Sequence, residues 1–69
     1  MSGLLAPEAR MGNDIARQFA HLPHDEAVQT IAAHIAKFWG PPMRATLVSL
    51  AERGDDSIDP LLADAAKRL

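Results

Sequence analysis

The sequence has no cysteine and no tyrosine, and its aromatic residues, histidine aside, are one tryptophan and two phenylalanines. Without cysteine the chain can form neither a disulfide bond nor a thiolate metal site. Domains below roughly 70 to 80 residues usually need such a staple, unusually good packing or a partner. We expect a single small helical domain over residues 1–69, with residues 1–6 forming a flexible N-terminus.

Large apolar side chains are also scarce, because 13 of the hydrophobic residues are alanines. Alanine has the highest helix propensity but buries little area, so the sequence favours helices around a thin core. Such a domain would gain stability by packing against another protein. No apolar run approaches the roughly 18 residues of a membrane span, and no secretory signal is recognisable. We therefore expect a cytoplasmic protein without membrane contact.

Positive charge is limited as well. Nine acidic residues outnumber seven scattered basic ones, and the net charge is −2. Nucleic-acid binding rests on lysine and arginine gathered on one basic face. A helix-turn-helix DNA binder would also need a basic recognition helix, which the sequence lacks. We therefore expect no nucleic-acid partner.

Proline and glycine divide the chain into expected helices. Proline favours the first position of a helix, and glycine favours the position just after its end. Asp59 before Pro60 is the typical cap-and-start pair, Gly40 stops the second helix, and Pro42 starts the third. The expected helical ranges are about 7–21, 25–39, 42–54 and 60–69.

Apolar residues at spacings of three and four give each of these segments one apolar stripe. The stripes are Met11, Ile15, Phe19 and Leu22; Ala27, Val28, Ile31, Ile35, Phe38 and Trp39; Met43, Leu47, Leu50 and Ala51; and Leu61, Leu62, Ala65 and Leu69. No segment alternates as a strand would. The fold class is therefore all-α: a small bundle of three to four short helices, formed by a helical hairpin plus two shorter helices. Which sides of the stripes are internal stays open.

Residues able to carry chemistry are few. His21 and His24 are three positions apart, but Pro23 breaks the helix that would align them, and His34 lies alone. A zinc site needs three or four ligands. The serines lack a glycine elbow and no phosphate-binding loop is present. We expect no catalytic, cofactor-binding or metal-binding residue in this chain, and no enzymatic activity of its own.

The segment from His34 to Arg44 contains the single tryptophan and one of the two phenylalanines. Trp39 can fill the core of the domain or also meet a partner, since tryptophan is enriched in binding hot spots. Arg44 can be solvated or can pair with a carboxylate of a partner. Both alternatives remain open for each residue.

Several of these segments together resemble a known family. The segments are Met11–Phe19, Pro23, Glu26-Ala27, Ile31–Trp39, Met43-Arg44 and Asp59-Pro60-Leu61. They are similar to the delta subunit of the NAD-dependent, molybdenum-containing formate dehydrogenases of bacteria. The most specific part is His-Ile-x-Lys-Phe-Trp followed by Pro-x-Met-Arg. Gly40 and Pro42 stand where that family typically has an acidic residue and an arginine.

This resemblance implies a noncatalytic accessory subunit of a cytoplasmic formate dehydrogenase complex, without a cofactor in this chain. The alpha subunit would hold a molybdopterin guanine dinucleotide and iron-sulfur clusters and oxidise formate to carbon dioxide. Beta and gamma subunits would pass the electrons to NAD. This chain would support assembly or stability of the alpha subunit, its main partner; the alternative is a maturation chaperone that leaves before the active complex forms.

The resemblance also supplies candidate partner-contact residues, limited to the positions that match the family. These are Asn13, Phe19, His34, Lys37, Phe38, Trp39, Met43 and Arg44.

Overall fold

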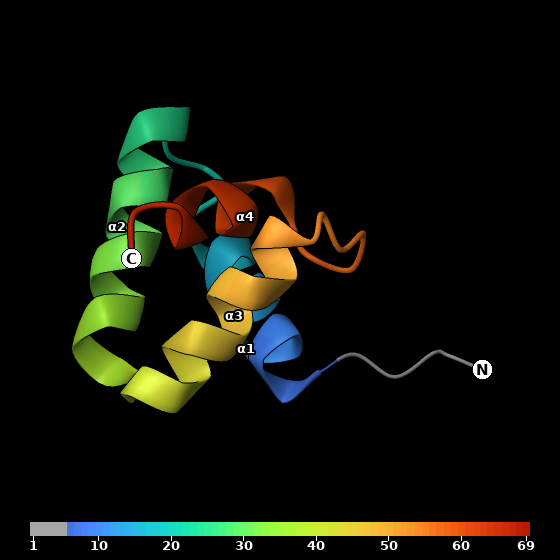
Figure 1. Ribbon diagram of the computed structural model, residues 1–69. Coiled ribbons are helices and arrows are strands. Elements are labelled where there is room, and N and C mark those ends of the chain that lie inside the picture. The colour runs from blue at the N-terminus through green and yellow to red at the C-terminus, as the bar shows by residue number, and fades with distance from the viewer. Residues whose placement is uncertain (1–5) are drawn as a thin grey trace.

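A computed structural model describes residues 6–69, which form four helices without any strand (Figure 1). The helices are α1 (Pro7–Gln18), α2 (His24–Phe38), α3 (Pro41–Glu52) and α4 (Pro60–Ala66). The prediction of an all-α fold is confirmed. The N-terminus that was expected to be flexible lies, apart from Ala6, outside the described residues. Within 6–69, no helix has the length and apolarity needed to cross a bilayer.

The helix starts follow the proline pattern. Three of the four helices begin with proline, and α2 follows Pro23 directly. The Asp59 carboxylate accepts a hydrogen bond of 2.8 Å from the Leu61 backbone N–H, as its predicted capping role requires. The first helix ends earlier than predicted, at Gln18. The turn that leads to Pro23 uses the next residues, and the Leu22 N–H donates to the Phe19 carbonyl at 3.1 Å.

The two predicted glycine stops differ in conformation. Gly54, with φ at 68°, ends α3 in a left-handed turn. Its N–H donates to the Ala51 carbonyl at 3.1 Å, and the Asp55 N–H donates to the Leu50 carbonyl at 3.2 Å, which together form a Schellman motif. Gly40 has φ at −72° and lies at the N-cap of α3. The α2 helix ends instead because Trp39 is extended.

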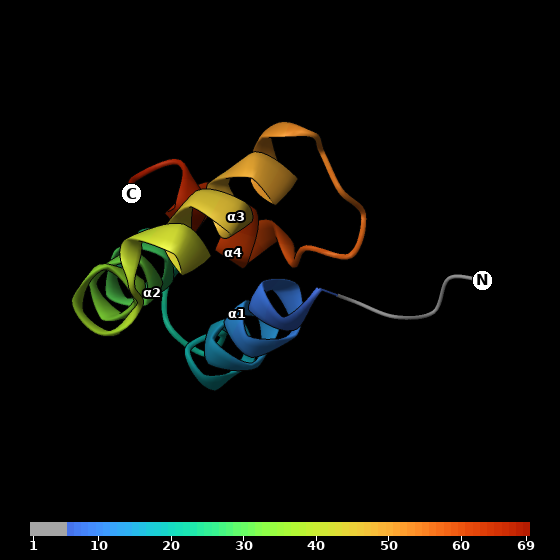
Figure 2. The same ribbon diagram turned by 60° about the horizontal axis from the view of Figure 1, so that its bottom comes forward.

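The short helix α4 lies at the centre of the fold. In Figure 2 it lies between α1 and α3, with α2 beside it, and it contacts all three. Its Leu62, Ala65 and Ala66 are buried. The α1 and α2 helices are joined by a short loop, as predicted for the hairpin, yet each contacts α4 more extensively than it contacts the other. The core is therefore organised around α4.

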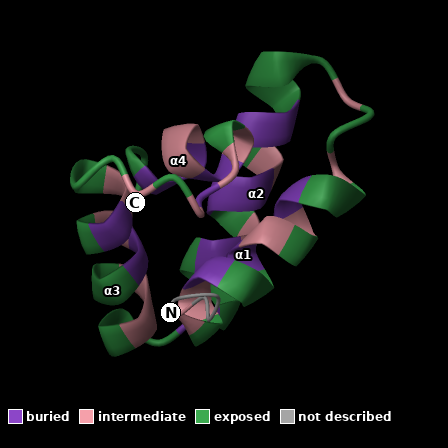
Figure 3. Ribbon diagram, turned by 90° about the vertical axis from the view of Figure 1, so that its right-hand side faces the viewer, coloured by how far each residue is buried: buried purple, intermediate pink, exposed green. Residues whose placement is uncertain are grey.

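The buried side of α1 is its small-residue side. Ala9, Gly12 and Ala16 are buried, while Met11 is 46% exposed and the rest of its apolar stripe is only half-buried (Figure 3). A Cβ atom placed on Gly12 would lie 2.6 Å from the Leu62 Cδ2 atom. Glycine thus lets the central leucine of α4 approach the α1 backbone. The larger apolar residues of α1 are left near the surface.

Polar groups join α1 to the loop before α4. The Asn13 side-chain amide donates to the Ser57 carbonyl at 2.7 Å, and its oxygen accepts from the Asp59 N–H at 2.9 Å. In the same loop, one Asp55 carboxylate oxygen accepts from the Ser57 hydroxyl at 2.6 Å and from the Ser57 N–H at 2.9 Å. Ile58, between these polar residues, is buried in the core. The loop is therefore held by hydrogen bonds to its backbone and by the burial of the Ile58 side chain.

Gly12→Ala should destabilise the protein although alanine is the better helix former. Overpacking against the fully buried Leu62 costs about 1–3 kcal/mol, and the gain in helix propensity is about 1 kcal/mol. We expect the free energy of unfolding to fall by about 1 kcal/mol in urea denaturation. In a Leu62→Ala background the same change should cost nothing. A more stable Gly12→Ala single variant would show that Leu62 is not confined.

Asp55 should contribute to the pH dependence of stability. The side-chain and backbone hydrogen bonds from Ser57 hold the pKa of the Asp55 carboxyl below its ordinary value, with a smaller contribution from the charge of Arg53. Since the folded-state pKa is lowered, this stabilisation is present at neutral pH and is lost as the pH falls below the ordinary range for aspartate.

Thermal melts of Asp55→Asn and the wild type should therefore differ at pH 7 and converge as the pH falls below the lowered pKa of Asp55. Asp56→Asn is the matched control, because no residue in 6–69 donates a side-chain hydrogen bond to this exposed neighbour. An equal response of the two variants at every pH would contradict the role given to Ser57.

Candidate functional site

The two adjacent aromatic residues at the end of α2 lie in different environments. Trp39 is only 6% exposed and belongs to the core, whereas Phe38 is 66% exposed. The helix ends at Phe38, and the extended backbone of Trp39 lets its side chain enter the core. The buried part of the predicted apolar stripe therefore continues from Ile35 to Trp39, and Phe38, although it belongs to the stripe by spacing, is exposed.

The exposed Phe38 ring has two neighbours on the same helix. The His34 ring lies one turn earlier, with 4.8 Å between the ring centroids and 43° between the ring planes. The Lys37 Nζ atom lies 5.5 Å from the centroid of the Phe38 ring. A cation at this distance from an aromatic face is attracted by the ring quadrupole. We call Phe38, His34 and Lys37 the Phe38 surface.

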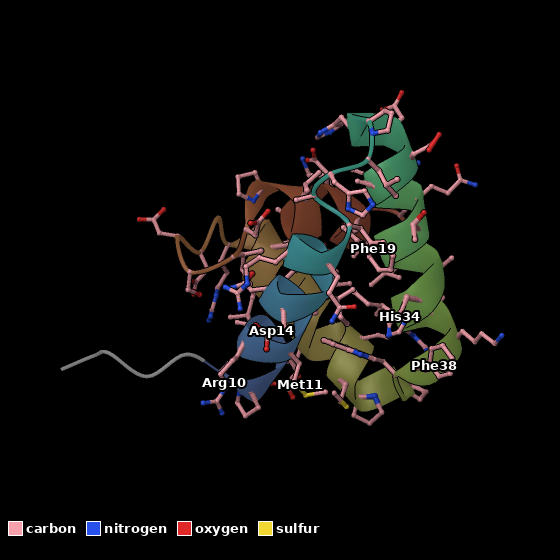
Figure 4. All side chains as sticks on the ribbon, turned by 180° about the vertical axis from the view of Figure 1, so that it is seen from behind. Arg10, Met11, Asp14, Phe19, His34 and Phe38 are labelled. Atoms are coloured by element: carbon pink, nitrogen blue, oxygen red, sulfur yellow. The ribbon has the colours of Figure 1, made fainter. Side chains whose placement is uncertain are left out.

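Two further apolar residues are labelled in Figure 4, the view that shows His34 and Phe38 of α2. They are Met11 of α1 and Phe19, the residue just after that helix. Met11 and Phe38 are large hydrophobic residues that remain exposed in this part of the chain, and Phe19 is half-buried. Met11 and Phe38 are thus exposed apolar side chains from two different helices.

Other predicted contact residues have contacts within the fold. Asn13 joins α1 to the loop before α4. The Arg44 guanidinium donates to the Trp39 carbonyl at 2.5 Å and to the Ala36 carbonyl at 3.5 Å, so it satisfies carbonyl groups at the end of α2. Met43 is half-buried against the core. Together with the buried Trp39, these residues support the end of α2, where Phe38 is exposed. We call the segment from Phe38 to Arg44 the corner.

The histidines of residues 6–69 do not gather into a metal site. In residues 6–69, no three histidine, aspartate or glutamate side chains are placed to hold a metal ion. The His24 Nε2 atom lies 3.0 Å from Asp64 Oδ2, an exposed pair that links α2 to α4. His34 contacts Phe38 instead. The histidines therefore lie in separate environments.

A cavity of about 300 Å³ between the last turns of α3 and α4 was not predicted from the sequence. Its lining residues are Val48, Ala51, Glu52, Ala66, Lys67 and Leu69. It is mainly aliphatic, with one carboxylate and one ammonium group. Leu69 contributes because α4 ends at Ala66, so that the last residues of the chain leave the helix.

Comparison with models of protein families gives one informative match. Residues 9–66 match the family described as NADH-dependent formate dehydrogenase delta subunit FdsD. No curated protein and no solved structure matches the chain. The matched range contains all of α2, α3 and α4 and most of α1. It therefore includes both the core around α4 and the Phe38 surface.

Alanine substitutions of Phe38 and Trp39 should have different effects on the free energy of unfolding, because Phe38 is exposed and Trp39 is buried. Phe38→Ala should change the free energy of unfolding by no more than about 0.5 kcal/mol, because exposed substitutions have small effects. Trp39→Ala should cost about 3 kcal/mol or more, because it opens a cavity in a thin core. Urea denaturation followed by circular dichroism measures both. Equal losses would mean that Phe38 also belongs to the core.

Proposed function

Because the chain belongs to the delta-subunit family of NADH-dependent formate dehydrogenases, we propose that it is a noncatalytic accessory subunit that binds the catalytic alpha subunit and supports its assembly or stability. The observation that carries the binding role is the 66% exposure of Phe38 beside His34 and Lys37. Covering such a side chain with a partner removes apolar area from water. The proposed complex is cytoplasmic.

The residues of this chain support the assignment of the redox centres to other subunits. The sequence has no cysteine to ligate an iron-sulfur cluster. The part of the chain that the structure describes gathers no three histidine or carboxylate side chains for a metal ion. We therefore propose that formate oxidation at the molybdenum cofactor belongs to the alpha subunit, and electron transfer to NAD belongs to beta and gamma.

The construction of the fold supports a binding role. Its core uses alanine at many buried positions, and its central helix has only seven residues. A domain of this size is marginally stable alone, and binding to a partner stabilises the folded form by mass action. The same interaction would stabilise the partner, because binding energy is shared by both components of a complex.

Affinity purification of the tagged full chain from its native cells tests the proposal. Alpha, beta and gamma subunits should copurify in constant ratio, and the eluate should reduce NAD when formate is added. Deleting the gene for this chain should lower the yield of assembled complex several-fold. The turnover per bound molybdenum should stay within about two-fold, because an accessory subunit does not touch the reacting atoms.

Three results would contradict the proposal. Recovery of only inactive alpha subunit without its cofactor would identify a maturation chaperone that leaves before the complex is active. Recovery without any formate dehydrogenase subunit would remove the accessory role. A loss of turnover per molybdenum at unchanged yield would instead assign this chain a part in catalysis.

A further inference from the structure

The charges of this chain are distributed unevenly. From Ala27 to Ala51 the sequence contains Lys37 and Arg44 but no aspartate or glutamate. The other residues carry all nine acidic side chains and five of the seven basic ones. The second half of α2, the corner and nearly all of α3 are therefore positively charged in a chain of net charge −2.

The positive groups at this corner have no carboxylate partner within the described residues. Arg17, Arg53 and Lys67 each lie within 4.0 Å of an aspartate, whereas no such ion pair includes Lys37 or Arg44, nor Arg10 or Arg68 elsewhere in residues 6–69. Their position suits the negative end of the α2 dipole, which accounts for their place at the helix end but leaves a net positive charge there. Lys37 lies beside the Phe38 ring, the most exposed large apolar side chain of residues 6–69, and Arg44 lies against the backbone on either side of it, at Ala36 and Trp39.

We propose that Phe38 inserts into an apolar pocket of the partner protein whose rim carries carboxylates, and that these carboxylates pair with Lys37 and Arg44. The inference rests on the proposed function, since the partner is the alpha subunit. Aromatic residues are enriched at the desolvated centres of interfaces, and complementary charges around them set orientation and association rate. The Lys37 Nζ atom already lies 5.5 Å from the centroid of the Phe38 ring, so its positive charge is beside the proposed contact.

The geometry of the corner favours this insertion. Trp39 is anchored in the core, and Arg44 binds the Trp39 carbonyl at 2.5 Å. Both contacts fix the backbone next to Phe38 before any partner arrives. A side chain presented by a rigid helix end loses less conformational entropy on binding than one on a mobile loop.

The inference is tested by measuring how tightly full-length variants of this chain bind the formate dehydrogenase complex purified from cells that lack this chain. The measurement is made at two salt concentrations. Phe38→Ala should weaken binding at least ten-fold. Lys37→Glu should weaken it at least ten-fold at 50 mM salt and clearly less at 500 mM, because salt screens the repulsion at an exposed rim. The matched controls are Arg68→Glu for the charge reversal and Leu69→Ala for an exposed apolar side chain remote from the corner in sequence. Both should stay within two-fold of the wild type.

The outcomes separate the inference from the proposed function. If the wild type binds while Phe38→Ala and Lys37→Glu bind like their controls, the accessory role stands and the docking proposal is wrong. If the wild type does not bind the complex, both are wrong. Sedimentation velocity of the chain alone gives a third outcome. If the chain self-associates, Phe38→Ala abolishes this, and the complex binds the variant normally, then Phe38 is covered by a second copy of the chain and the proposal is overturned.

Discussion

The close approach of Leu62 to Gly12 is the contact on which the arrangement of the four helices depends. The fully buried leucine lies where a side chain on Gly12 would begin, so α4 can lie directly against the α1 backbone. From this position a helix of seven residues reaches all three of the others. A larger residue at position 12 would push the central helix outward and loosen the packing of each neighbour. The thin core therefore tolerates little change at this point.

The same contact explains why large apolar residues of α1 remain near the surface. The helix turns its smallest residues inward to admit Leu62, and Met11 on another side stays exposed. Phe38 is left outside for a different reason, because the chain leaves the helix immediately afterward and Trp39 enters the core. Two different packing constraints thus leave Met11 and Phe38 exposed.

Local signals were sufficient to predict the helices and most of the residues that α2, α3 and α4 bury, but not the inward side of α1 or the exposure of Phe38. Proline at a helix start and the Asp59 cap act within a few residues, so these features could be found in the sequence. The inward side of α1 depends on Leu62, about fifty residues later, and no periodicity in α1 contains that information. For Phe38 and Trp39, helical spacing alone allows either residue to continue the stripe. Only the extended backbone after the helix decides between them.

The single tryptophan gives this small domain a built-in optical probe. No tyrosine competes with its emission, and the indole lies in the core directly beside the exposed Phe38. Fluorescence from an unlabelled chain therefore reports on one known point, the junction between α2 and α3. Unfolding would move this indole into water and shift its emission to longer wavelength. A partner that covered the neighbouring Phe38 while the fold stayed intact would leave the indole buried and its emission at short wavelength, so the two events can be told apart.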